Sequence, residues 1–403
     1  MRRFYQYIIQ YHLDHFRQMV FLAGPRQVGK TTISRLMADD ASDFHYINYD
    51  ILEDRQLILA GPNHIWDFIE GDVAKTCQSI IVFDEIHKYS GWKTFLKGFF
   101  DAYGHRIKII VTGSAKLDVY KSGGDSMMGR YLLYVICPLS VAEIIGRKDI
   151  TRDISLPTKI EDIAYNNLLE YGGFPELFLS SDPKLILRLQ KQKNALLLYE
   201  DIRSLTQIHE LSQLEVLAEL LKGQVGSLIN RSSLSKKINV AASTIGRWIS
   251  TLEAFYYCFA VYPWSRNIER SLIKEPKLYL WDWSLITDDI GARSENFIAS
   301  HLQKAVYCWN DQGLGEYGLY YLRDKDQNEV DFLVVKDNQP WFLVEVKHSS
   351  NQGLSKSLYY YQKKTGAKHA FQVVIDMDYA DLDCFKYTDP VIVPAKTFLA
   401  QLV

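Results

Sequence analysis

Residues 21–32 read FLAGPRQVGKTT, and this stretch decides the fold of the first third of the chain. It contains the pattern G-x-x-x-x-G-K-[ST] from Gly24 to Thr31, between an apolar run at 18–23 and a helical start at 31–38. Glycines let the backbone turn tightly, so that successive N–H groups and the helix N-terminus point at anionic oxygens. The stretch therefore predicts a phosphate-binding loop, whereas the alternative is a strand-to-helix turn that happens to contain these residues.

Each position of the loop has an expected role in binding ATP. The Lys30 ammonium can reach the β- and γ-phosphates, and the Thr31 hydroxyl can ligate Mg²⁺. The expected nucleotide-binding residues are Gly24, Pro25, Arg26, Gln27, Val28, Gly29, Lys30, Thr31 and Thr32. ATP and Mg²⁺ are accordingly the expected cofactors.

Length and composition limit the class of protein. A chain of 403 residues exceeds the size of one hydrophobic core, and 47% hydrophobic with 23% charged residues is an ordinary globular composition. The net charge of −2 means that any nucleic-acid site must be a local basic patch. Five widely spaced cysteines argue against a zinc site and favour a reducing compartment. Polar residues interrupt the apolar start at 1–16, so we expect a cytoplasmic protein without a membrane span.

A second motif follows at the usual distance from the loop. Residues 79–84 read SIIVFD, an apolar run that predicts a central strand of a parallel sheet buried on both faces. It ends in Asp84 and Glu85, the acidic pair of a Walker B motif. Asp84 would hold the Mg²⁺ shell, and Glu85 would orient or deprotonate the attacking water. Strands and helices alternate around these motifs, as a parallel sheet with crossover helices requires.

Two further residues are candidates for sensing and stabilising the phosphates. The strand at 106–111 runs into Thr112-Gly113-Ser114, where a small polar side chain can sense the γ-phosphate; Ser114 is preferred over Thr112, and a plain strand-ending turn is the alternative. After a Gly/Ser-rich loop, Arg130 precedes an apolar strand at 131–136. It could reach the nucleotide of a neighbouring subunit as an arginine finger, or it could be a solvated surface residue.

At this point the chain resembles a large group of prokaryotic AAA-type ATPases. The segments that carry the resemblance are GPRQVGKTT, IIVFDEIHK followed by GWKTFLKGFFD, VTGSA and GRYLLYVICPLSVAEI. The resemblance covers nearly the whole chain and implies an AAA-type core over 1–150. It also implies a C-terminal domain of unknown function related to PD-(D/E)XK nucleases. The functional positions of that group match Lys30, Thr31, Asp84, Glu85, Ser114 and Arg130 here. A trans arginine finger further implies a homo-oligomer.

The middle of the chain reads as two helical parts. Residues 151–208 are expected to form a helical lid or connector, broken by the tight turn of the GGFP stretch at 172–175. Residues 209–265 contain a short helix, a turn and a Ser/Thr-capped helix, which predicts a winged helix-turn-helix-like module. Its basic and hydroxyl side chains could contact DNA, or the module could serve packing or protein contact. These side chains are Lys236, Lys237, Ser243, Thr244 and Arg247, followed by Arg266 and Arg270.

Residues 266–403 are expected to form an α/β nuclease-like domain. An amphipathic helix at 293–306 carries Glu295, a strand at 329–336 carries Asp331, and a strand at 341–347 carries Glu345 and Lys347. Strand side chains alternate, so Glu345 and Lys347 point to one face. Asp331 and Glu345 could hold Mg²⁺, while Lys347 positions a water and Glu295 supplies an extra acid. Surface strands often mix Glu and Lys, so the pattern predicts the fold better than it predicts activity.

Three functions remain open on these observations. The first is an ATP-hydrolysing AAA-type protein that couples nucleotide state to DNA handling, with metal-dependent cleavage by the C-terminal domain. The second is a slow nucleotide switch or scaffold whose C-terminal domain is an inert binding module. The third is a nucleotide-binding protein whose helix-turn-helix binds promoter DNA. DNA-stimulated ATP hydrolysis separates the first function from the second.

Overall fold

The computed structural model divides the chain into two compact units, Met1–Cys137 and Pro138–Val403. The finer boundaries expected at 150, 208 and 265 stay predictions. The structure describes residues 3–41, 43–70, 79–113, 127–149, 151–180, 182–203, 206, 208–265, 275–351 and 353–403. Ser114, Arg266 and Arg270 therefore lie outside the described residues.

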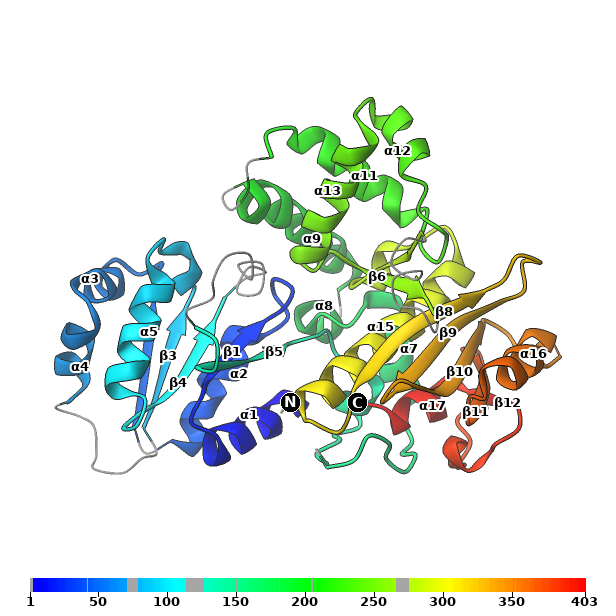
Figure 1. Cartoon of the computed structure of the whole chain (residues 1–403), viewed down its shortest axis with the longest axis horizontal. Coiled ribbons are helices and arrows are strands. Elements are labelled where there is room, and N and C mark those ends of the chain that lie inside the picture. The colour runs from blue at the N-terminus through cyan, green and yellow to red at the C-terminus, as the bar shows by residue number, and fades with distance from the viewer. Residues whose placement is uncertain are drawn as a thin grey trace. The chain divides into compact units, whose positions relative to one another are not determined.

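The first unit is built on a parallel sheet (Figure 1). In its described part the strand order is β2-β3-β4-β1-β5, and each neighbouring pair is parallel, as the alternation of strands and helices predicted. Because the strands are parallel, their carboxyl ends share one edge, and β4 lies between the strand of the glycine loop and the strand of the acidic pair. The strands are β1 Met19–Ala23, β2 Phe44–Asn48, β3 Ile80–Asp84, β4 Lys108–Thr112 and β5 Tyr131–Val135.

Helices cover both faces of this sheet. On one face Phe83 of β3 meets Phe95 and Phe99 edge to face, within a core cluster that also contains Ile65 and Trp66. Figure 1 shows α1 and α2 on the other face. The burial of β3 from both sides explains why its sequence is apolar throughout. The helices are α1 Phe4–His15, α2 Lys30–Leu36, α3 Leu52–Ala60, α4 Pro62–Glu70 and α5 Trp92–Tyr103, with 3-10 turns η1 Met37–Asp40 and η2 Ile86–Lys88.

The second unit begins with helices. The GGFP stretch separates α7 from α8, and a Cβ on Gly173 would lie 2.6 Å from the Leu139 carbonyl oxygen, so this turn requires close backbone approach. Further along, Asn239 in the left-handed region ends α12 and turns the chain into α13. The elements are α6 Val141–Ile144, α7 Asp162–Tyr171, α8 Pro175–Leu179, α9 Pro183–Leu196, η5 Leu197–Ile202, α11 Leu211–Lys222, α12 Arg231–Ile238 and α13 Ala242–Ala254.

A mixed sheet forms the rest of the second unit. Its described strands are ordered β12-β11-β10-β9-β8-β6-β7, with β8, β9 and β10 antiparallel and β10, β11 and β12 parallel. β6 belongs to this sheet, although the sequence placed its residues in the preceding module. The strands are β6 Cys258–Pro263, β7 Lys277–Leu280, β8 Tyr317–Arg323, β9 Glu329–Lys336, β10 Gln339–Lys347, β11 His369–Val374 and β12 Val391–Pro394. The helical elements are η6 Trp283–Leu285, α15 Ile290–Asp311, α16 Lys356–Thr365, η7 Cys384–Lys386 and α17 Ala395–Gln401.

A buried ion pair fastens α6 to α15 in this unit. The Lys304 ammonium contacts the Glu143 carboxylate and donates to the Pro138 carbonyl oxygen at 2.9 Å, and both side chains are at most 2% exposed. Beside it, the Val141 N–H donates to His301 Nε2 at 3.2 Å. Within the described ranges, no helix has the length and hydropathy needed to cross a membrane.

Candidate nucleotide site and a second acidic site

The phosphate loop joins β1 to α2 in a conformation that its glycines make possible. Gly24 has φ 137°, and an added Cβ would overlap the Ile136 carbonyl oxygen. Gly29 has φ 98° and forms the N-cap of α2. Gln27 is also left-handed, at φ 61°. The two motif glycines therefore occupy positions where a larger residue would be strained.

Lys30 lies at the centre of this loop. It is 8% exposed, and its ammonium donates to the carbonyl oxygens of Gly24 at 2.9 Å and Pro25 at 2.7 Å. The remaining loop residues differ in their exposure. Val28 is buried, Arg26, Gly29 and Thr31 are half-buried, and Gln27 and Thr32 are exposed. The loop thus presents one buried cation at the N-terminus of a helix.

Asp84 is the meeting point of the loop and the sheet. Thr31 Oγ1 donates to Asp84 Oδ2 at 3.0 Å, and the hydroxyls of Thr112 and Tyr46 also donate to this carboxylate. The parallel register places Thr112 directly beside Asp84, which is 3% exposed. A carboxylate beside hydroxyl oxygens is a donor set that suits Mg²⁺, because hard cations prefer oxygen ligands. The structure thus brings together the Thr31 and Asp84 that the sequence predicted.

Glu85 follows in a strained turn next to basic side chains. Its φ is 56°, and its carboxylate lies 3.4 Å from Lys88 Nζ and 3.7 Å from His87 Nε2. Burial raises the pKa of Glu85, while Lys88 lowers it. Burial lowers the pKa of His87 to about 4, so its imidazole is neutral at pH 7. The Lys88 ammonium is shared with Asp50 at 2.6 Å.

Arg130 lies at the amino ends of the strands, whereas the phosphate loop lies at their carboxyl ends. It immediately precedes β5, whose first residue pairs with Met19 at the start of β1. The four steps of β5 span about 13 Å, so Arg130 is far from the phosphate loop of its own chain. Its guanidinium forms a two-pronged contact with Asp101 of α5, at 2.8 and 3.0 Å. This contact lowers the pKa of Asp101.

Two side chains at this site were missed by the sequence analysis. Tyr46 reaches Asp84 from β2, and the Arg35 guanidinium lies 4.3 Å from its ring centroid. Arg3, at the start of α1, donates to the Val28 carbonyl at 2.9 Å and to the Cys137 carbonyl at 2.7 Å, and so ties the loop to the end of β5. The alternation of β2 could have indicated Tyr46, but nothing in the sequence pointed to Arg3.

The predicted acidic residues of the second unit also come close together. The Val346 N–H donates to Asp331 Oδ2 at 2.8 Å, which joins β9 to β10 at this point. Lys347 Nζ donates to Glu345 Oε1 at 2.9 Å. Burial and the neighbouring Asp331 charge raise the pKa values of both Glu345 and Glu295. The structure therefore places Glu295, Asp331, Glu345 and Lys347 in one electrostatic cluster.

β7 adds a lysine and a tyrosine that the sequence did not single out. Lys277 is 2% exposed, lies 3.4 Å from Glu295 Oε1 and also contacts the Glu329 carboxylate. The Tyr279 hydroxyl donates to Glu295 Oε1 at 2.6 Å. Lys277 thus brings a positive charge into the acidic cluster from a strand that lies across the sheet from β10. We use the name acidic cluster for Lys277, Tyr279, Glu295, Asp331, Glu345 and Lys347.

The donors of the acidic cluster suit a cation only in part. Glu345 Oε2 is buried and accepts no hydrogen bond from the described residues, which leaves one carboxylate oxygen available. However, in the described part of the chain no three His, Cys, Asp or Glu side chains are grouped to hold a metal ion.

Three family profiles match successive parts of the chain. Residues 16–145 match the sequence profile described as "AAA domain". Residues 162–296 and 290–395 match two profiles described as domains of unknown function, DUF8612 and DUF4143. The first match and the parallel sheet with its glycine loop support a P-loop ATPase of the AAA type. The other two matches carry no activity with them.

The relatives found are themselves uncharacterized proteins. One from Methanocaldococcus jannaschii is 25% identical over 82% of this chain and 74% of its own length. One from Mycobacterium tuberculosis is 23% identical over 85% of this chain and 73% of its own. Among solved structures, PCH-2 of C. elegans aligns with 61% of this chain and 68% of its own at 12% identity. Its TM-score of 0.27 is too low to carry an argument.

Proposed function

We propose that the protein hydrolyses ATP at the loop of its first unit and that a second copy of the chain completes the site. The observation that carries the proposal is the position of two groups of side chains. Lys30, Thr31 and Asp84 come together at the carboxyl ends of the strands, while Arg130 lies at the amino end of β5. An arginine about 13 Å away along β5 does not serve its own phosphate loop. Its distance from this loop supports a role toward the nucleotide of another chain.

The side chains divide the work of phosphoryl transfer. Lys30 would exchange its contacts to the Gly24 and Pro25 carbonyls for the phosphate oxygens of ATP. Thr31 and Asp84 would hold Mg²⁺, which would neutralise charge on the phosphates. Glu85 would orient the attacking water, and its raised pKa supports a role in accepting a proton. The partner's arginine at position 130 would stabilise charge that develops in the transition state.

The test is an ATPase assay on single variants and on their mixture. Lys30→Ala, Glu85→Gln and Arg130→Ala should each lose most of the turnover, whereas Arg152→Ala, a control at a side chain 74% exposed, should not. Mixing Glu85→Gln with Arg130→Ala should restore activity, because a mixed interface joins an intact Glu85 to an intact Arg130. Full activity of Arg130→Ala, or no recovery on mixing, would refute completion in trans.

A second proposed function is action on nucleic acid by the second unit. The proximity of Glu295, Asp331, Glu345 and Lys347 supports a site for a phosphodiester, of the nuclease-like kind that the sequence predicted, with Glu345 Oε2, among the described residues, as the one oxygen left for a cation. Cleavage should be assayed on single-stranded, duplex and branched DNA with Mg²⁺ or Mn²⁺. Asp331→Asn and Lys347→Ala should abolish it. If wild type leaves all forms intact, the acidic cluster is an inert binding module.

DNA contact by α12 and α13 is the third element of the proposal. These helices are joined by a three-residue turn, and Lys236, Lys237, Ser243 and Arg247 are exposed on them. This arrangement supports a helix-turn-helix that binds DNA phosphates. DNA should then stimulate ATP hydrolysis, and Arg247→Ala should reduce the stimulation. Turnover that DNA leaves unchanged favours the alternative, a slow nucleotide switch.

Four buried free cysteines among the described residues support a reducing cytoplasm as the location of the protein.

A further inference from the structure

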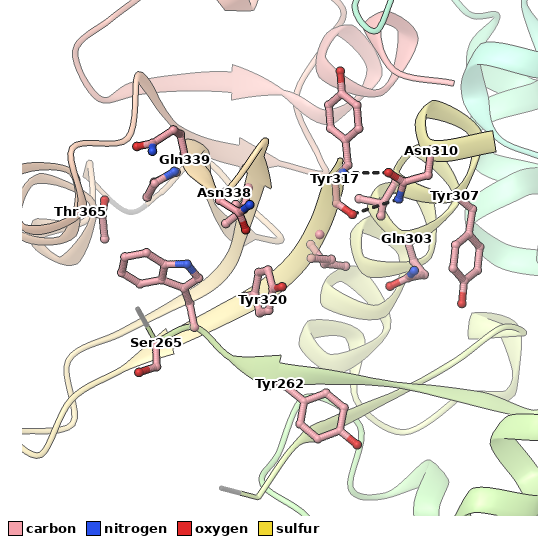
Figure 2. Close-up of a pocket in the computed structure, with 16 residues that line it drawn as sticks. Tyr262, Ser265, Gln303, Tyr307, Asn310, Tyr317, Tyr320, Asn338, Gln339 and Thr365 are labelled. Carbon is pink, nitrogen blue, oxygen red and sulfur yellow. Dashed lines mark hydrogen bonds between the residues drawn. The ribbon is translucent and has the colours of Figure 1, made fainter. Parts of the chain in front are cut away.

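A pocket of about 780 Å³ lies within the second unit, against its mixed sheet (Figure 2). It lies between α15 and the strands β6, β8 and β9. β6 and β8 pair at Tyr262 with Tyr320 and at Pro263 with Tyr321, and Tyr317–Leu319 of β8 line the pocket beyond that pairing. The volume falls within the range of ordinary small-molecule sites.

Aromatic rings form one side of this pocket. Tyr262 and Tyr320 are partners in a parallel register, so their side chains leave the sheet on the same face, and Trp264 follows two residues later. All three are half-buried, so part of each ring remains accessible. Gly318 makes room for the Tyr320 ring, since a Cβ there would lie 2.7 Å from Tyr320 Cε2.

Carboxamides supply the polar contacts. Gln303 of α15 and Asn338 and Gln339 of the β9–β10 turn line the pocket (Figure 2), and none of their amides hydrogen-bonds to the described part of the chain. Asn310 differs, because its amide is committed to the N–H and carbonyl of Tyr317 at 2.8 and 2.9 Å. None of the described residues that line the pocket carries a charge.

We infer that this pocket binds a nucleobase. A flat ring stacks on aromatic side chains, and its edge pairs donors with acceptors as a carboxamide does. The inference does not depend on ATP hydrolysis by the first unit. The base can belong to a free nucleoside or to a nucleic-acid strand, and the binding test below distinguishes these two ligands.

The test is a binding titration on the full chain carrying Lys30→Ala, which removes the ammonium of the proposed ATP site. The probes are free nucleosides, a single-stranded oligonucleotide, an abasic strand of the same length and a neutral oligosaccharide. Binding of nucleosides alone identifies a nucleoside site, and binding of the oligonucleotide but not of the abasic strand identifies a strand. Equal binding of the abasic strand, binding of only the oligosaccharide, or no binding overturns the inference.

Variants then locate the binding in the pocket. Tyr320→Leu and Trp264→Leu should each weaken binding about five-fold or more, because each removes one stacking surface while keeping an apolar side chain. Tyr359→Leu is the matched control, since Tyr359 is 54% exposed on α16 and does not line the pocket. Thermal melting checks that the variants fold. In a background with intact Lys30, ATP turnover by Tyr320→Leu should equal wild type. Unchanged nucleobase affinity in both folded pocket variants overturns the inference.

Discussion

Replacing Lys304 by Met should destabilise the second unit strongly and in a way that depends on pH. The substitution keeps the apolar stem but removes the Lys304 ammonium from the Glu143 carboxylate, whose side chain is 1% exposed. Removing one partner of a buried pair typically costs about 3–5 kcal/mol of unfolding free energy. That is a large part of the roughly 5–15 kcal/mol that keeps a domain folded.

The size of the loss can also be worked from protonation. The cost of keeping this carboxylate charged is limited by the cost of protonating it, which from an ordinary carboxyl pKa near 4.3 is about 3.7 kcal/mol at pH 7. At pH 5 the same step costs about 1 kcal/mol. Because loss of the Lys304 cation favours the protonated form of this buried carboxyl in the folded variant, the stability of the variant should fall as the pH rises.

Urea unfolding followed by tryptophan fluorescence measures this loss at both pH values. Lys304→Met combined with Glu143→Leu should recover much of the stability, because paired apolar groups leave no buried charge. Lys222→Met is the control, since Lys222 pairs with Glu219, whose side chain is 62% exposed, and exposed pairs contribute little. A loss below about 1 kcal/mol at pH 7, or an equal loss at pH 5 and pH 7, would refute the reasoning.

Three further predictions concern the first unit and the buried histidine. Tyr46→Phe removes one hydroxyl from Asp84 and should lower kcat/KM for ATP about ten-fold. An unchanged kcat/KM in a steady-state ATPase assay would contradict a role for this hydroxyl. Arg3→Gln releases the Val28 and Cys137 carbonyls and should weaken ATP binding about ten-fold by titration; equal affinity would contradict its bracing role. Burial lowers the pKa of His301 to about 3, so the unfolded chain takes up a proton first as the pH falls below about 6.5. Wild type should therefore lose about 1.4 kcal/mol per pH unit relative to His301→Gln between pH 6 and pH 4, and parallel stability curves would exclude this.

Local patterns predicted much of the fold because they act over short distances. The apolar runs before Gly24 and Asp84 predicted β1 and β3 to within a residue or two of the observed bounds. The alternation in 329–347 likewise predicted β9 and β10. In each case the period of apolar residues matches the period of the backbone. The roles assigned to the site residues, including Ser114 beyond the described ranges, stay predictions.

Other features could not be predicted because their partners are distant in the sequence. Lys277 and Glu329 are separated by a long helix and a strand, and no local pattern marks them as a pair. Tyr262 and Tyr320 meet only because β6 joins the edge of the sheet at β8. The pocket beside them, and its proposed nucleobase, therefore have no signature in the sequence.

The sequence by itself determined the phosphate loop, the acidic pair and the parallel direction of the strands in the first unit, since glycine conformation and strand burial are properties of neighbouring residues. Only the tertiary structure decided which side chains complete these motifs. Tyr46 and Arg3 reach the loop and Asp84 because β2 and α1 pack beside them, and Arg130 lies at the amino ends of the strands because β5 runs parallel to β1. Long-range packing is a property of the whole chain, and so it becomes visible only once the chain is folded.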